Sequence, residues 1–163
     1  MRAWIATLLL VVVGAWAATS ETTTTATPVP AFALPDLDGK QVKLADFNGK
    51  ALVIVFLTTW AEPCVEQLAT LIDLQRRFGG EEFTVIGLSL DEKGAKQVKE
   101  FAAAKKVNFP ILMVDYPTVQ AFGGVTGLPT TFVTEKKHFI LHRYEGIVEK
   151  KVLEADVQGI LKK

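Results

Sequence analysis

The residue best suited to carry out chemistry is Cys64, the only cysteine in the sequence. It follows a continuous apolar run at 51–58, which is typical of a strand buried on both faces, and it begins a segment of helical period. Open α/β folds place their sites at this carboxyl edge of the sheet. The unpaired N–H groups of a first helical turn favour a thiolate. The position of Cys64 therefore indicates a thiol suited to nucleophilic or redox chemistry.

A second candidate lies at residues 127–129, where a Gly-Leu-Pro sequence enters an apolar segment. A proline that begins a strand after a glycine turn is a candidate for a cis peptide bond, so we expect one between Leu128 and Pro129. This entry would leave the backbone N–H and C=O groups of Leu128 free to pair with an extended ligand. Trp60 and Pro63 flank the cysteine of the first candidate.

Two further pairs of polar residues carry weaker signals. His138 and His142 are four residues apart on a predicted strand, so both should face one side, where two imidazoles can share a metal ion. No Cys, Asp or Glu accompanies them on that strand face, and we expect no metal site. Asp91 and Glu92 follow a second buried strand and are interpreted as its solvated end rather than as an acid–base pair.

Strands that alternate with helices must position these residues. Their order implies an α/β fold with a central sheet covered by helices on both faces, preceded by an N-terminal β-hairpin extension. A final pair of strands makes the sheet mixed. The expected elements are a hairpin at 32–43, strands at 51–58, 83–90, 111–114, 130–134 and 138–145, helices at 62–78, 94–106 and 149–162, and one helical turn at 117–123.

The composition excludes several functional classes. The 18 Lys and Arg residues balance 18 Asp and Glu residues, which argues against a nucleic-acid binder because such proteins carry a basic excess. A single cysteine excludes an intramolecular disulfide and a zinc site made of several cysteines. The sequence contains no glycine-rich phosphate loop, and we expect no cofactor.

Residues 1–17 predict a signal peptide. A positive end, an uncharged apolar run and small residues before the expected cleavage after Ala17 form the usual pattern. The alternative is an uncleaved membrane tether at 3–18, a stretch shorter than the ~20 residues that span a bilayer. Residues 18–30, rich in Thr and Pro, are interpreted as a linker, and residues 31–163 as the folded domain. The expected location is the periplasm or cell envelope.

Four stretches of the chain resemble one protein family in their order and approximate spacing. They are FALPDLDGKQVKLADFNGK at 32–50, VIVFLTTWAEPC at 53–64, VIGLSLDE at 85–92 and GLPTTFV at 127–133. With these stretches the chain resembles the TlpA/ResA-type branch of the thioredoxin-like superfamily, which is related to the AhpC/TSA redoxins. The resemblance implies a thioredoxin-like fold, a cis-proline at Pro129, and thiol–disulfide chemistry in the cell envelope with protein or peptide thiols and disulfides as partners.

The chain departs from the family motif W-C-x-P-C, because residues 60–64 read W-A-E-P-C. Carried over by position, Ala61 occupies the place of the attacking cysteine and Cys64 that of the resolving cysteine. Ala61 cannot attack a disulfide, and Cys64 alone has no partner thiol to resolve a mixed disulfide. We therefore expect reduced or lost activity. The resemblance implies a groove that binds a peptide, and the residues expected to line it are Trp60, Glu62, Pro63, Leu128 and Pro129.

Three functions remain open on the sequence alone. The first is an exported thiol–disulfide redox protein of reduced or lost activity, and the second is a non-catalytic module that binds a peptide. The third is a one-cysteine peroxiredoxin-like antioxidant protein. It is disfavoured because Leu57 and Ala61 stand where the motif Pro-x-x-x-Thr-x-x-Cys has its proline and threonine.

The reactivity of Cys64 depends on whether its side chain is buried. Cys64 shares a predicted helix face with Leu68 and Leu71, so we expect it to point inward. Burial raises the pKa of a thiol and restricts access to it. Two interpretations of Cys64 therefore remain. It is either an inert buried thiol or a one-cysteine redox residue whose mixed disulfides are resolved by an external thiol.

Overall fold

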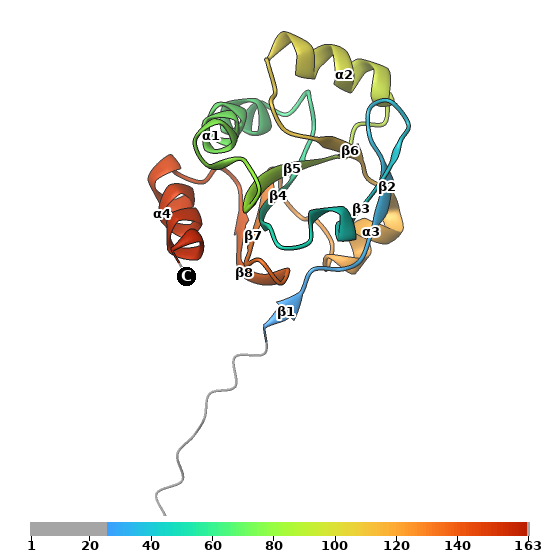
Figure 1. The fold of residues 1–163 in the computed structure, drawn as a ribbon. Coiled ribbons are helices and arrows are strands. Elements are labelled where there is room, and N and C mark those ends of the chain that lie inside the picture. The colour runs from blue at the N-terminus through green and yellow to red at the C-terminus, as the bar shows by residue number, and fades with distance from the viewer. Residues whose placement is uncertain (1–25, 163) are drawn as a thin grey trace, which may run out of the picture.

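A six-stranded sheet forms the centre of the molecule in this computed structural model, which describes residues 26–162 (Figure 1). Its strands are Thr27–Pro28 (β1), Ala51–Leu57 (β4), Phe83–Ser89 (β5), Ile111–Met113 (β6), Thr130–Thr134 (β7) and Phe139–Glu145 (β8). They follow one another in the order β1-β8-β7-β4-β5-β6. β4, β5 and β6 are parallel, whereas β7 and β8 run antiparallel to their neighbours. The predicted mixed sheet is confirmed.

The two central strands consist of residues that suit a sheet buried on both faces. Every residue of β4 and β5 is buried. In β4, Val53 and Val55 belong to one core cluster and Ile54 to the other, as the alternation of side chains along a strand requires. Full burial stabilises an aliphatic side chain of this kind by about 1.5–3 kcal/mol. These strands therefore provide a rigid base for the loops at their carboxyl ends.

Helices and a hairpin cover the two faces of the sheet. Figure 1 shows α1 and α4 on one side and α3 with the hairpin on the other. The helices are Glu62–Phe78 (α1), Ala95–Ala104 (α2), Tyr116–Ala121 (α3) and Lys150–Leu161 (α4), and the hairpin consists of Ala33–Pro35 (β2) and Gln41–Lys43 (β3), followed by the 3₁₀ helix Leu44–Phe47 (η1). The α/β class and the N-terminal hairpin are confirmed, and the predicted helices differ from the observed ones only at their ends.

The sheet begins earlier in the chain than the sequence predicted. β1 lies within the segment interpreted as a linker, yet its Thr27 pairs with Ile140 on β8. Val29 is buried, and its N–H donates to the carbonyl oxygen of His138 at 2.8 Å. A strand of two residues is too short for any periodicity to reveal. The predicted signal peptide and most of the linker lie outside the described residues.

The two histidines do not share a strand face, so that prediction is wrong. The turn after β7 extends through His138, which has a positive φ of 62°, and β8 begins at the next residue. The His138 ring is buried, with Nε2 3.0 Å from the carbonyl oxygen of Phe47. His142 lies on β8, with Nε2 3.7 Å from a carboxylate oxygen of Asp156. Within residues 26–162 no three His, Cys, Asp or Glu side chains are grouped as a metal site requires.

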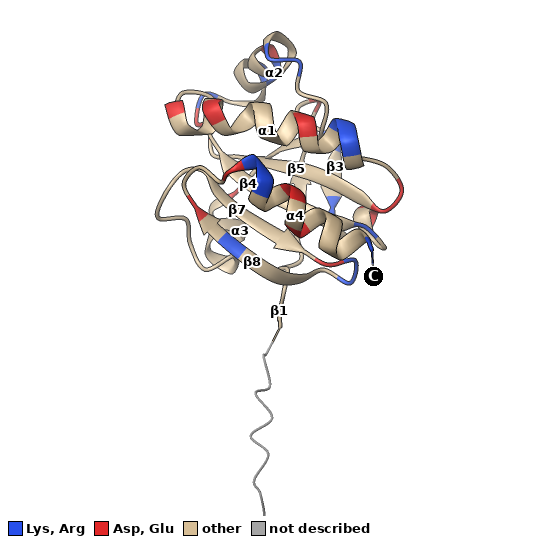
Figure 2. Cartoon of the chain, turned by 90° about the vertical axis from the view of Figure 1, so that its left-hand side faces the viewer, with Lys and Arg blue, Asp and Glu red and all other residues tan. Residues whose placement is uncertain are grey.

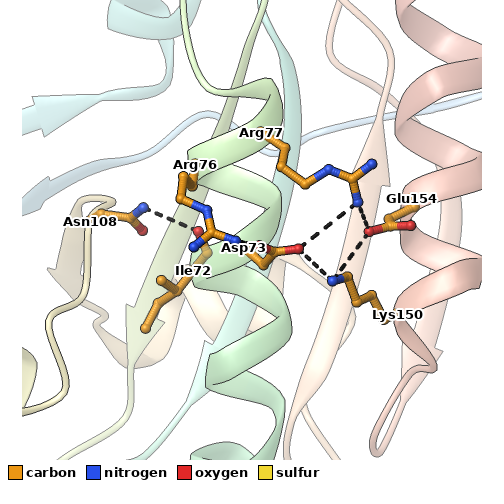
Figure 3. Close-up of polar contacts among 7 residues, drawn as sticks. All are labelled: Ile72, Asp73, Arg76, Arg77, Asn108, Lys150 and Glu154. Atoms are coloured by element: carbon orange, nitrogen blue, oxygen red, sulfur yellow. Dashed lines mark hydrogen bonds and ion pairs between the residues drawn. The ribbon is translucent and has the colours of Figure 1, made fainter.

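A cluster of charged side chains links α4 to α1 (Figure 3). Lys150 Nζ lies 2.6 Å from Asp73 Oδ2 and 3.7 Å from Glu154 Oε1. Arg77 pairs with Glu154, and Arg76 pairs with Asp73. The hydrogen bond from Lys150 lowers the pKa of Asp73. Ion pairs at a surface contribute about 0–1 kcal/mol each, so the cluster adds little to the stability of the fold.

The surface formed by α1 and α4 carries both signs of charge. Figure 2 shows acidic and basic residues on each of these helices. None of the helices in the described part of the chain is long and apolar enough to cross a membrane.

Candidate functional site

The loop between β4 and α1 carries the motif residues. Ala61 is the N-cap of α1, and its carbonyl oxygen accepts the N–H groups of Cys64 at 3.0 Å and Val65 at 3.2 Å. Pro63 lies in the first helical turn, where its missing N–H costs nothing. Ala61 is half-buried, whereas Glu62 and Pro63 are exposed. The position that the family motif gives to an attacking thiol thus holds a methyl group, which has no nucleophilic atom.

The Cys64 side chain is buried in the core, as the sequence predicted. Its exposed fraction is 4%, and it belongs to the same apolar cluster as Leu68 and Leu71. Burial raises the pKa of the Cys64 thiol, hydrogen bonds with Thr58 oppose that effect, and the charge of Asp91 adds to it. A thiol attacks as its thiolate. Burial therefore lowers the reactivity of Cys64 both by restricting access and by favouring the protonated form.

A buried carboxylate holds the residues that precede the motif. The backbone N–H of Thr59 donates to both carboxylate oxygens of Asp91, at 3.0 and 3.2 Å, and the Thr59 hydroxyl donates at 2.6 Å. The Ser89 hydroxyl donates to Asp91 at 2.7 Å. Asp91 is 7% exposed, so the prediction of a solvated strand end is wrong for this residue, although Glu92 is exposed. The reason is that Thr59 of the β4–α1 loop and Ser89 of β5 supply hydrogen-bond donors to its carboxylate.

Trp60 lies on the β5 side of the motif. Its side chain is 73% exposed, which is unusual for so large an apolar surface. It lines a hollow of about 270 Å³, and none of the other predicted binding residues contributes to that hollow. The remaining lining residues are Leu90, Asp91, Glu92 and Lys93.

The Leu128–Pro129 entry lies on the other, β7 side of the motif. The pairing of β7 with β4 extends to Thr130, which places Pro129 opposite the end of β4. The Leu128–Pro129 peptide bond is cis, Pro129 is buried, and Leu128 is half-buried against the core cluster that contains Cys64. The backbone N–H and C=O of Leu128 form no hydrogen bond with any other described residue. Both groups are therefore free to pair with a ligand.

The structure brings some predicted site residues together and separates others. Ala61, Cys64 and Leu128 contact one core cluster beneath the motif, and Pro129 follows Leu128 directly. Trp60 lies toward β5, on the far side of the motif from β7. The predicted groove thus consists of two surfaces that flank the start of α1.

Gln67, a polar residue on the inward face of α1, was not among the predicted site residues. It is 1% exposed, and its side-chain amide bonds both backbone groups of Val148. Val148 belongs to the loop between β8 and α4, and the N–H of Gly146 in that loop donates to the carbonyl oxygen of Pro129 at 2.8 Å. The available signal was a polar side chain at helical spacing among apolar ones.

Comparisons with known proteins agree with this geometry. The model of the AhpC/TSA family matches residues 25–143. The thioredoxin-like protein YneN of Bacillus subtilis (strain 168) is 32% identical over 126 residues, which cover 77% of this chain and 74% of that protein. The thiol-disulfide oxidoreductase ResA of Bacillus anthracis is 30% identical over 134 residues, which cover 82% of this chain and 75% of that protein.

Solved structures support the same assignment. The crystal structure of a thiol:disulfide interchange protein of the thioredoxin family from Chlorobium tepidum TLS has a TM-score of 0.76 and 28% identity to this chain. The alignment covers 83% of this chain and 96% of that one. The predicted thioredoxin-like fold is confirmed. The chain belongs to the AhpC/TSA family, as a thioredoxin-like protein of the TlpA/ResA type.

Proposed function

We propose that this chain is an exported thioredoxin-like protein of the cell envelope that no longer turns over disulfides but still binds extended protein segments. One observation carries the proposal. The first motif position holds the methyl group of Ala61, and the single thiol, Cys64, is 4% exposed. Attack on a disulfide and release of the mixed disulfide need two thiols. The relative named as a thiol-disulfide oxidoreductase supports protein thiols or disulfides as the class of partner.

The features that remain at the site need no nucleophile. Leu128 offers a free backbone N–H and C=O, which is what an extended segment needs in order to pair as an added strand. On the other side of the motif, Trp60 offers an exposed indole, and aromatic side chains of this kind dominate many binding interfaces. These two surfaces support backbone pairing on the β7 side and an apolar contact on the β5 side.

Reduction of insulin disulfides in the presence of dithiothreitol tests the loss of turnover. The wild-type protein should reduce insulin no faster than dithiothreitol alone. Ala61→Cys should accelerate the reaction, because it restores an attacking thiol next to Cys64. The matched control is Ala61→Ser, which places a hydroxyl group at the same position and should stay inactive.

Turnover by the wild-type protein would contradict the proposal, and a second variant would then identify the mechanism. Loss of that turnover in Cys64→Ser, together with a dependence on added small thiol, would assign a one-cysteine mechanism. Turnover that survives Cys64→Ser would remove thiol chemistry from the account altogether.

Intact-mass measurement of protein recovered from the cell envelope tests the proposed export. A mature chain that begins at Ala18 is expected from the pattern of residues 1–17. A mass that retains these residues, in protein that fractionates with membranes, would show that the apolar run at 3–18 acts as a tether.

A further inference from the structure

The segment of residues 124–127 leads from α3 to Leu128 and lies outside any helix or strand. Its N–H groups at 125–127 form no hydrogen bond with another described backbone group. Gly123 and Gly124 have φ angles of +83° and +79°, a conformation that residues other than glycine rarely adopt. Adjacent glycines give the backbone more conformational freedom than other residues would. Contacts from elsewhere in the fold must therefore fix the approach to Leu128.

Arg143, on β8, holds the first residue of this segment. Its Nη2 donates to the carbonyl oxygen of Gly124 at 3.2 Å and to Glu145 Oε1 at 3.0 Å. The guanidinium carbon lies 5.4 Å from the ring centroid of Phe132, which is buried. A planar guanidinium stacks on a ring while its N–H groups bond in the plane, and an ammonium group cannot combine the two. The buried ring thus fixes the guanidinium, which in turn fixes Gly124.

Glu145 holds a second residue of the segment. The carboxylate oxygen that accepts the N–H of Arg143 also accepts the hydroxyl of Thr126 at 3.2 Å. Arg143 and Glu145 are two residues apart on one strand, so both side chains lie on the same face of the sheet. At the far end of the segment, the Thr130 hydroxyl donates to the carbonyl oxygen of Gly127 at 2.6 Å. Two side chains of β8 therefore hold most of the approach to Leu128.

We propose that Arg143 and Glu145 are positioning residues of the binding surface, which fix the 124–127 segment and so hold the backbone N–H and C=O of Leu128 in the orientation that an extended segment pairs with. They act through the segment and not by contact with the ligand. A segment that is ordered before binding loses less conformational freedom on binding, so its ligand binds more tightly. The inference rests on the proposed function, because it concerns the pairing at Leu128.

Binding of the S-carboxymethylated insulin B chain, an extended polypeptide without free thiols, tests the proposal by calorimetric titration. Arg143→Lys keeps the positive charge but loses the stacked, planar donor group, and it should bind about fivefold more weakly than wild type. A direct ion pair between Arg143 and the carboxymethyl groups of the ligand would instead survive in this variant. Wild-type affinity in Arg143→Lys would therefore overturn the proposal.

Glu145 allows a conservative substitution to be compared with a disruptive one. Glu145→Ala removes the acceptor and should bind about fivefold more weakly than wild type. Glu145→Gln keeps an oxygen that accepts from Thr126 and Arg143, so its affinity should stay within about twofold of wild type. The double variant Arg143→Lys/Glu145→Ala should bind less than about twofold more weakly than Glu145→Ala, because both residues act on one segment. Equal losses in Glu145→Gln and Glu145→Ala, or additive losses in the double variant, would contradict the proposal.

A matched control for the Arg-to-Lys exchange is available on α1. Arg76 is exposed and pairs with Asp73, about 20 Å along the helix from its start at Glu62. Arg76→Lys also replaces the guanidinium of an ion pair without changing the charge, and its affinity should equal that of wild type. An equal loss of affinity in Arg76→Lys and Arg143→Lys would show that the position of Arg143 does not matter, against the proposal.

Backbone NMR order parameters of residues 125–128 separate this proposal from the proposed function. They should be close to those of β7 in wild type, Glu145→Gln and Arg76→Lys, and should fall below about 0.6 in Arg143→Lys and Glu145→Ala. Absence of peptide binding by the wild-type protein, with this pattern of order parameters intact, would refute the proposed function and leave the positioning role supported. Unchanged order parameters in Arg143→Lys and Glu145→Ala would refute the positioning role whatever the wild type binds.

Discussion

Replacement of Asp91 by Asn should weaken the fold and make the buried thiol more reactive. The carboxylate accepts the N–H and hydroxyl of Thr59 and the hydroxyl of Ser89. Asparagine has nearly the same shape but only one acceptor oxygen, so its NH₂ group would face a donor. The charge of Asp91 also raises the pKa of Cys64, and its removal should lower that pKa. Stability and thiol reactivity should therefore change in opposite directions.

The size of the stability change follows from the burial of Asp91. At 7% exposure, water does not readily replace a hydrogen bond that the substitution removes. A hydrogen bond to a charged group contributes about 1.5–3 kcal/mol, and a buried donor without a partner costs about 1–3 kcal/mol. Because Asn retains one acceptor, we expect the free energy of unfolding to fall by about 2 kcal/mol. For a domain of this size the Tm should fall by about 4–8 °C.

Urea unfolding and alkylation of Cys64 by iodoacetamide measure the two effects. A looser fold also exposes the thiol, so alkylation is followed as a function of pH, and its midpoint should move to lower pH in Asp91→Asn. The matched control is Glu92→Gln, which removes an exposed neighbouring charge and should change stability by less than about 0.5 kcal/mol. Unchanged stability in Asp91→Asn, or an alkylation midpoint at higher pH, would refute this reasoning.

Three further predictions concern the scaffold around the site. Leu71 is 1% exposed, so Leu71→Ala should lower the free energy of unfolding by about 2–5 kcal/mol, as measured by urea unfolding. Burial, together with the hydrogen bond that its hydroxyl donates to Asp156, raises the pKa of Tyr144 to about 12. The pKa of a tyrosine in an unfolded chain is about 10, so the stabilisation that protonated Tyr144 gives the fold is complete below pH ~10 and is lost as the pH rises through 12. Tyr144→Phe should therefore abolish this alkaline decrease in Tm. The hydrogen bond from Lys150 lowers the pKa of Asp73, so the wild-type protein should be more stable than Asp73→Asn above about pH 4. This difference in the free energy of unfolding should disappear at lower pH, as Asp73 becomes protonated in the folded protein.

The elements that could be predicted are those whose residues follow a period over many positions. The seven buried residues of β4 and the apolar face of α1 appear where the sequence placed them. β1 could not be predicted, because two paired residues carry no period. The turn that takes in His138 looked like a continuation of the strand alternation, and the ring of His138 instead contacts the carbonyl oxygen of Phe47, 91 residues away.

In the candidate site, too, the features that could be predicted are those set by neighbouring residues in the sequence. The absence of a nucleophile at Ala61 and the burial of Cys64 follow from the motif and from helical spacing, which are local. The roles of Asp91 and Gln67 follow from partners 32 and 81 residues away in the chain. Such pairs leave no pattern in one sequence. The separation of Trp60 from Leu128 likewise depends on strand order, because β5 and β7 flank β4 on opposite sides.

The central claim is that the site binds an extended segment without a nucleophile. Calorimetric titration of the S-carboxymethylated insulin B chain into wild type and Cys64→Ala tests it most directly, because neither the ligand nor the variant has a thiol. We predict the same Kd for both proteins, with or without dithiothreitol, since the backbone groups of Leu128 are unchanged. Absence of binding by the wild-type protein, or loss of binding in a folded Cys64→Ala variant, would contradict the account.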